Sequence, residues 1–295
     1  MVDARPLNGE VALCADDFAI AEGVSRAILD LVDAGRLSGV SAMASTPSWP
    51  ELARELVSRR GQVAIGLHLD LTLSPFDGLA PALPLRDLML KSLFGRLDIP
   101  ALTVEFERQF DAFERAVGFS PDHIDGHHHI HSMPQVREAL LSVLRRRYRT
   151  LPDRDRPLVR DPTDKIGRIL ARRGQARKAF AVAVVGAGLR QQLARNGFRG
   201  NLGFAGFSAF HREIPFNREL DAFLIAPGPR HLVMCHPGLP DAALAVLDPL
   251  CARRRDEYLA LKGRGDIATW MLRIERRADD PGMAFAQWLD VGCAV

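Results

Sequence analysis

The sequence predicts an α/β protein with a (β/α) barrel, TIM-like and irregular, that carries a helical, arginine-rich excursion. Short apolar runs alternate with helical patterns along most of the 295 residues, as in parallel strands joined by helices. About seven such units favour a closed or nearly closed barrel over an open sheet. No Gly-x-Gly-x-x-Gly motif follows the first apolar run, so a dinucleotide-binding fold has no support.

The first half of the chain contains three apolar runs separated by helical patterns. Strands are expected at 9–15, 38–44 and 62–69, and helices at 21–34 and 50–60. Gly35 and Gly61 follow the two helices and Pro50 begins the second, which are typical signals at helix ends. A loop rich in proline and glycine then covers 70–84, and loops of this length are often functional.

The second half continues the alternation of strands and helices. Helices are expected near 85–94, 101–117 and 134–147, and strands near 122–127, 157–160, 200–205 and 231–236. The stretch 145–196 has a mostly helical pattern, and terminal helices are expected near 251–261 and 265–277. We therefore expect a single domain over 1–295 with a helical insertion near 161–198.

The composition is that of an ordinary globular protein, with 47% apolar and 25% charged residues. It excludes wholesale disorder, collagen and coiled coils. The uncharged run Ala179–Leu189 is shorter than the roughly 20 apolar residues that span a bilayer, and no signal peptide is recognised at the start. We expect no membrane span, a cytoplasmic location and, since no Cys-x-x-Cys pair occurs, four reduced cysteines that are mostly buried.

The net charge is only +3, but basic residues are concentrated in one stretch. Residues 145–178 hold 13 basic and four acidic side chains. Such a stretch could attract an anionic substrate, a phosphorylated sugar or a membrane surface, although a solvated helical region is the simpler interpretation. The excess of arginine over lysine is typical of genomic base composition, and we expect no nucleic-acid partner.

Five of the nine histidines fall in one motif, HIDGHHHIH at 123–131. In an extended chain, alternate side chains share one face, which here would hold His123, Asp125, His127, His129 and His131. Imidazoles and carboxylates bind zinc, iron or manganese and also transfer protons. Gly126 lets the chain bend, so not all of these side chains can be ligands. Hydrogen-bonded core histidines beside a solvated loop are the alternative.

Three further sites place polar residues at the ends of predicted strands. Asp16 and Asp17 follow the first strand, His68 the third and His236 the last. Taken alone, each of these residues is more often a helix cap or an ordinary buried residue. A parallel barrel, however, brings the carboxyl ends of its strands to one rim. One aspartate could bind a metal while the other acts as a general base, and an imidazole could protonate the leaving amine. The pattern indicates a hydrolytic metal site.

These motifs resemble the YdjC-like carbohydrate deacetylase family, which includes chitooligosaccharide deacetylases. Ala15–Phe18 is similar to its N-A-D-D-F-G, Ile65–Thr72 to its I-G-x-H-x-x-L-T, and His123–Pro134 to its H-[IL]-D-S-H-H-H-V-H-x-x-P. Gly206–Phe210 and Val233–Gly238 are similar to later segments. The resemblance covers about residues 10–262.

The resemblance implies a metal-dependent hydrolase that removes the acetyl group from an N-acetylated sugar or oligosaccharide. It implies that Asp17, His68 and His127 hold the metal, that Asp16 is the general base, and that His236 is the acid or stabilises the transition state. The choice of His127 over His129 comes from the family alone. Family practice suggests Mg²⁺, whereas the ligand types also suit Zn²⁺ or another transition metal.

Four residues are assigned to substrate binding: Arg160, Phe207, His129 and His131. A surface salt bridge for Arg160 and core packing for Phe207 and Phe210 are the alternatives. Two positions depart from the family pattern, which has Asn where this chain has Cys14 and Gly where it has Ala19. Neither change removes a ligand, but Ala19 restricts the backbone beside the site.

Other functions stay open at this level. A metal-dependent phosphoesterase or another amide hydrolase would use similar residues, but related metallohydrolases usually carry His-x-His after the first strand, where this chain has Asp16 and Asp17. A non-catalytic metal- or sugar-binding relative is disfavoured because the ligands and the base are intact. The sugar could be a chitobiose-like oligomer, a glycolipid head group or a nucleotide sugar. The oligomeric state is open, a homodimer included.

Overall fold

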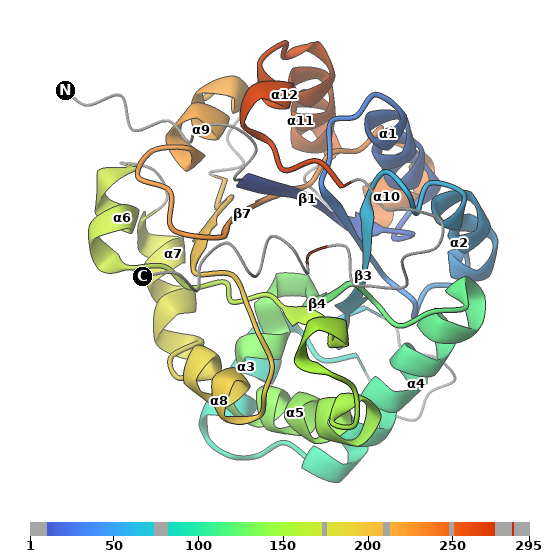
Figure 1. Cartoon of the computed structure of the whole chain (residues 1–295), viewed down its shortest axis with the longest axis vertical. Helices are drawn as coiled ribbons and strands as arrows, with labels where there is room; N and C mark the ends of the chain where they lie inside the picture. The colour runs from blue at the N-terminus through green and yellow to red at the C-terminus, as the bar shows by residue number, and fades with distance from the viewer. Residues whose placement is uncertain are drawn as a thin grey trace.

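In the part of the chain that the structure describes, seven parallel strands form one curled sheet with helices packed around it (Figure 1). This computed structural model describes residues 11–73, 82–172, 176–208, 213–247, 251–274 and 285. The strands are β1 Val11–Phe18, β2 Gly39–Ala42, β3 Ala64–Leu69, β4 His123–Gly126, β5 Leu158–Val159, β6 Gly203–Ala205 and β7 His231–Cys235. Their order is β5-β4-β3-β2-β1-β7-β6. The predicted α/β barrel is confirmed. Its two end strands, β5 and β6, do not pair with each other, so the sheet is open between them.

The gap between β5 and β6 is bridged by other hydrogen bonds. The amide of Val159 donates to the carbonyl of Arg199 at 2.9 Å. The side chain of Asn201 accepts from the amide of Asp161 and donates to its carbonyl, both at 2.8 Å. An asparagine side chain thus replaces a ladder rung, and the barrel is nearly closed.

Most of the helices follow the strands in the order that the sequence predicts. They are α1 Glu22–Asp33, α2 Trp49–Val57, α3 Leu85–Leu93, α4 Ile99–Val117, α5 Pro134–Tyr148, α6 Ile166–Ala171, α7 Ala176–Val185, α8 Leu189–Arg195, α9 Phe216–Phe223, α10 Ala242–Leu247, α11 Cys251–Gly263 and α12 Ile267–Trp270. The long α4 shows why the ends fall where they do: Asp98 caps its first turn by accepting from Ala101, and Gly118 ends it at φ 81°. No helix in these described ranges is long and apolar enough to cross a membrane.

The core lies between the sheet and the ring of helices. Every residue of β1 is buried, which fits a central strand of a parallel sheet. Trp49 of α2 stacks on Phe113 of α4 at 5.4 Å between ring centroids and meets Phe18 of β1 edge-on at 6.5 Å. These rings join two helices to the carboxyl end of β1.

The carboxyl-terminal part of the chain differs from the prediction. The helix expected near 265–277 is only the short α12, after which Met271 forms a bridge with Val11 and the amide of Leu272 donates to Val11 at 2.8 Å. The chain becomes extended there because it pairs with the start of β1. Helices α9 and α10 were not predicted. Residues 275–277, Phe210 and Cys293 lie outside the described residues.

Many arginines of the basic stretch 145–178 are engaged within the protein. Arg147 on α5 forms an ion pair with Glu114 on α4 at 2.9 Å, and Arg172 forms one with Asp164 at 2.7 Å. Helices α6, α7 and α8 occupy the region where a helical insertion is predicted; that the chain is one domain with an insertion stays a prediction. Cys14 and Cys235 are buried and Cys251 is half-buried, all three as free thiols.

Candidate active site

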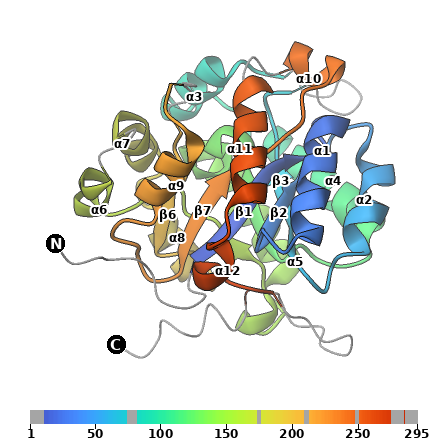
Figure 2. The same ribbon diagram turned by 90° about the horizontal axis from the view of Figure 1, so that it is seen from above.

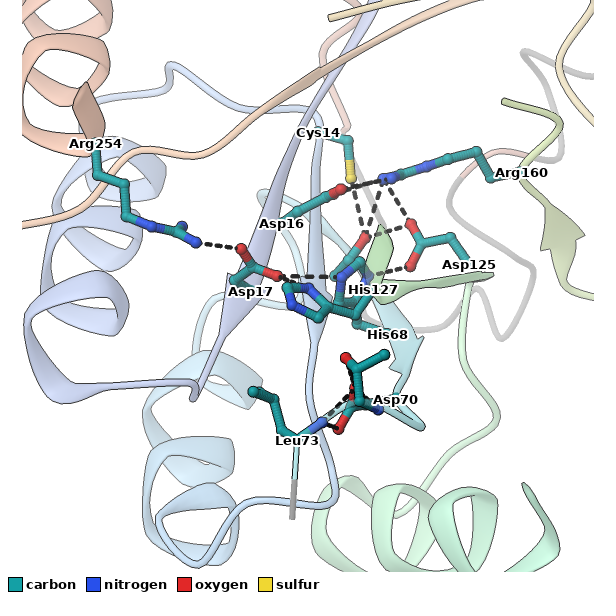
Figure 3. Close-up of polar contacts among 12 residues, drawn as sticks. Cys14, Asp16, Asp17, His68, Asp70, Leu73, Asp125, His127, Arg160 and Arg254 are labelled. Carbon is teal, nitrogen blue, oxygen red and sulfur yellow. Dashed lines mark hydrogen bonds and ion pairs between the residues drawn. The ribbon is translucent and has the colours of Figure 1, made fainter. Parts of the chain in front are cut away.

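The carboxyl ends of β1, β3, β4 and β7 meet at a cavity of about 650 Å³. All five residues predicted to be catalytic or to bind the metal line it: Asp16, Asp17, His68, His127 and His236. Figure 3 shows the first four with their polar neighbours. The strand ends therefore bring these side chains together, as a parallel barrel requires.

Both aspartates reach the cavity because β1 is irregular at its end. Neighbouring residues of a regular strand point to opposite faces. Here the register with β2 shifts between Ala15 and Phe18, and Asp17 adopts φ 67°. The amide of Ile20 donates to the Asp17 carbonyl at 3.1 Å and closes the turn, in which Ala19 also has a positive φ of 73°. The bulge re-aims one carboxylate so that two adjacent ones face the same site.

Asp17, His68 and His127 form the centre of the site. The Asp17 Oδ1 atom lies 2.9 Å from His127 Nδ1 and 3.2 Å from His68 Nε2. Its Oδ2 atom accepts from Arg254 Nη2 at 2.6 Å. Burial alone would raise the pKa of Asp17, but the imidazole of His127 and the guanidinium of Arg254 hold it well below its usual range.

This donor set fits a divalent cation. One carboxylate oxygen and one nitrogen from each imidazole lie within 4.8 Å of one another. A carboxylate with two imidazoles is a common ligand set of catalytic metal sites that keep positions open for water. All three side chains are buried or nearly so, so they are already held close together.

Asp125 connects the two halves of the site. Its Oδ1 atom lies 2.6 Å from His68 Nδ1, which leaves His68 Nε2 directed at Asp17. Burial alone would lower the pKa of His68, but Asp125 and Asp17 raise it to about 10. The Oδ2 atom of Asp125 accepts from Ser41 Oγ at 2.7 Å and from Arg160 Nη2 at 2.5 Å. A carboxylate behind a histidine ligand fixes the ring in this way in many metal sites.

Asp16 is held by the same arginine. The guanidinium of Arg160 donates to both carboxylate oxygens of Asp16, each at 2.7 Å, in a bidentate pair. An oxygen of Asp16 lies within 4.8 Å of a ring nitrogen of His68. Asp16 lines the cavity beside Asp17, so its position is compatible with accepting a proton there.

The histidine motif does not stay extended. β4 ends at Gly126, and 127–132 form a turn in which His128 and His129 have φ 54° and 59°. The expected alternation is therefore wrong beyond Gly126. His129 lines the cavity and packs edge-on against Phe204 and Phe207 at 5.7 and 5.4 Å between ring centroids.

Two of the residues assigned to substrate binding are not on the cavity wall. Arg160 is fully buried and its guanidinium faces Asp16 and Asp125. His131 is fully buried and its Nε2 atom lies 2.9 Å from the Arg160 carbonyl. The turn after β4 directs His131 inward. Arg160 and His131 therefore contact other residues of the site and do not face the cavity. Phe207 and His129 do line the cavity.

His236 follows β7, the strand that pairs with β1, and lines the same cavity. Its amide donates to Glu257 Oε2 on α11 at 2.6 Å. Burial lowers the pKa of the His236 imidazole and raises the pKa of Glu257 to about 7. The buried carboxylate of Glu257 fixes the backbone at the end of β7.

Four supporting residues were not assigned a role from the sequence: Ser41, Asp125, Arg254 and Glu257. The sequence does point to Asp125, since it stands two residues before His127 in the motif. It does not point to Arg254 or Glu257, because an Arg and a Glu on a charged helix are typical surface residues. Their role depends on how α11 packs over the ends of β1 and β7.

Comparisons with known proteins agree with this arrangement. A family model described as YdjC-like protein matches residues 10–265. Chitooligosaccharide deacetylases of Yersinia pestis (strain Pestoides F) and Yersinia pseudotuberculosis serotype O:1b (strain IP 31758) are each 31% identical over 128 residues, which is 41% of this chain and 50% of theirs. The chain therefore spans about half the length of these curated relatives.

A solved structure has the same fold. It is a proposed cellobiose-phosphate cleavage protein from Enterococcus faecalis V583, with a TM-score of 0.62 and 19% identity over 87% of this chain and 92% of that one. This likeness supports the fold alone. Since the family model extends over most of the sequence and the motif residues meet at one cavity, the chain belongs to the YdjC-like family.

Proposed function

We propose that this protein is a metal-dependent deacetylase of an N-acetylated carbohydrate. The convergence of Asp17, His68 and His127 beside a second carboxylate, Asp16, carries the proposal. Two relatives that match part of the chain are named chitooligosaccharide deacetylases, and an acetamide is a substrate suited to such a site.

Asp17, His68 and His127 would hold the cation. A divalent cation bound there would polarise the acetamide carbonyl and lower the pKa of a water. Mg²⁺ is the proposed cation on family resemblance. The two imidazoles also suit Zn²⁺ or another transition metal, because Mg²⁺ prefers oxygen ligands.

Two residues are assigned to proton transfer. Asp16 accepts the proton of the attacking water, with Arg160 holding both its oxygens so that the carboxylate does not rotate. His236, which lines the same cavity after β7, gives a proton to the departing amine.

Substrate contacts are assigned to Phe207 and His129, whose rings line the cavity next to the site. An aromatic ring can pack on the apolar face of a sugar. Arg160 and His131 are assigned supporting roles. A cytoplasmic location and a homodimer stay predictions.

The test is acetate release from a panel of N-acetylated sugars. Metal-stripped protein is assayed first, and then after addition of Mg²⁺, Zn²⁺, Mn²⁺ or Co²⁺ in turn. We expect no acetate without metal and restored release with at least one cation. Phosphate release from phosphorylated sugars, without acetate from any acetylated one, would instead establish the phosphoesterase alternative.

A further inference from the structure

The outer part of the cavity has an apolar wall built by several elements. Leu85 begins α3, Ala181 and Val182 belong to α7, Leu247 ends α10, and Phe207 follows β6. Leu85 is 37% exposed and Leu247 is 46% exposed, although both line the cavity. Large apolar side chains at the mouth of a site are costly to leave in water unless something covers them.

The same wall offers few hydrogen-bonding groups for sugar hydroxyls. Among the lining residues in the described ranges, none is Asn, Gln, Tyr or Trp. The hydroxyl of Thr72 donates to Asp70 at 2.9 Å, and that of Ser208 donates to Glu219 at 2.6 Å. The amine of Lys178 donates to the Ser208 carbonyl at 3.0 Å. Orientation of a second sugar ring needs several well-placed polar groups, and this wall supplies mainly hydrocarbon.

The apolar character continues onto the outside of the molecule. Val246, next to Leu247, is 86% exposed, and Val184, two residues after Val182, is 75% exposed. Figure 2 shows α3 and α10 at the same end of the barrel. A ligand group that leaves the cavity past Leu247 therefore meets Val246 as a further apolar side chain, whereas Val184 lies on another face of α7 from Val182.

We infer that the substrate is an amphiphile, an N-acetylated sugar that carries a hydrocarbon aglycone. This inference rests on the proposed deacetylase function. The acetamide lies at the polar end of the cavity, between Asp16 and His236, and the hydrocarbon lies along Leu85, Val182 and Leu247. Each methylene that leaves water for such a wall strengthens binding about fourfold, so a few methylenes outweigh the loss of a second sugar ring.

The experiment compares acetate release from the methyl, butyl and octyl β-glycosides of N-acetylglucosamine and from N,N′-diacetylchitobiose. The full chain is used with the cation that restores activity, and glycosides are kept below their micellar concentrations. We expect kcat/KM to rise at least tenfold from the methyl to the octyl glycoside, with the octyl glycoside preferred over the disaccharide. Equal kcat/KM for the three glycosides, or a preference for the disaccharide over all of them, would overturn the inference.

Variants locate the hydrocarbon. Leu85→Ser and Leu247→Ser should each reduce the octyl-to-methyl ratio of kcat/KM about threefold, and the double variant should bring it towards unity. Leu259→Ser is the matched control, because Leu259 on α11 is 51% exposed but does not line the cavity; its ratio and both rates should equal those of the wild type. A ratio that survives the double variant contradicts the assignment.

Different results would overturn the amphiphilic substrate and the deacetylase activity. Acetate release that does not depend on chain length overturns the amphiphile and leaves the deacetylase. Absence of acetate from every acetylated substrate, in protein shown to bind metal, overturns the deacetylase and the amphiphile with it.

Discussion

The polar end of the cavity and its apolar outer wall are built in opposite ways. At the polar end, Asp125 is fully buried and connects His68, Ser41 and Arg160 through contacts of 2.5 to 2.7 Å. At the wall, Leu247 lies on a six-residue helix and is 46% exposed. A buried charged network is costly to alter, because removing one partner leaves another charge unpaired. An exposed leucine can change with little effect on folding.

This difference indicates which parts of the barrel determine the reaction and which determine the choice of substrate. The strand ends hold groups whose separations must stay within a fraction of an ångström for proton transfer. The helices and loops above them only need to present a surface to the rest of the substrate. Substitutions at the strand ends should therefore affect turnover or metal binding with every substrate, whereas substitutions in the wall should affect the choice among substrates.

The largest expected effect is at Asp16. Asp16→Asn removes the proton acceptor but keeps all three candidate ligands, so turnover should fall by roughly 10²–10⁴ while metal affinity stays within a few-fold. Acetate release and metal titration on the same preparation measure the two quantities. A near-normal rate would contradict the role of Asp16, and a parallel loss of metal would make it a ligand.

His127 and His129 give the next comparison. The structure directs His127 Nδ1 at Asp17, 2.9 Å away, and packs His129 against two phenylalanines. His127→Ala should weaken metal binding by at least 100-fold, because one of three ligands is lost, while His129→Ala should keep metal affinity and raise KM. Metal titration followed by kinetics distinguishes them. Unchanged metal affinity in His127→Ala would move the ligand to another histidine of the turn.

Asp125 tests whether a residue that positions a metal ligand matters as much as the ligand itself. Asp125→Asn weakens the restraint on the His68 ring and leaves Arg160 with one carboxylate fewer, so metal affinity should fall by roughly 10–100-fold and turnover should also fall. Asp122→Asn is the matched control: Asp122 is buried three residues earlier and accepts from the amide of Ile65 at 2.9 Å.

Both variants should lose thermal stability, but only Asp125→Asn should lose metal affinity when the comparison is made on folded protein. Circular dichroism establishes that each variant is folded before titration. Equal metal affinities in the two variants would reduce Asp125 to a structural residue.

The strand ends were predictable from the sequence because short apolar runs mark the strands of a parallel barrel. Asp16, Asp17 and His68 each stand directly at the end of such a run, and the fold brings them to one rim. These three residues are local to their strands, so a local pattern was enough. His127 stands just after β4, but its choice over His129 came from the resemblance to the family and not from the pattern.

The residues behind and around the site depend on contacts between distant segments. Alternation failed after Gly126 because His128 and His129 adopt positive φ, which no run of histidines signals. Arg160 was expected near substrate, yet it faces two carboxylates that come from β1 and β4. Arg254 reaches Asp17 across 237 residues of sequence. Only the packed barrel brings these partners together.

The smallest expected effect is on folding stability, and it concerns backbone strain at the end of β1. Ala19 adopts φ 73° in the turn that aims Asp17 into the cavity, and an L residue with a side chain is strained there by roughly 1–2 kcal/mol. Glycine relieves the strain but costs entropy in the unfolded chain, so Ala19→Gly should stabilise the protein by about 0.5–1 kcal/mol. Chemical denaturation measures the change. Ala21→Gly is the control, because Ala21 has an unstrained φ of −154° and gains nothing. If Ala19→Gly is no more stable than the wild type, the turn is held without strain. Metal affinity should then be equal in the wild type and in Ala19→Gly.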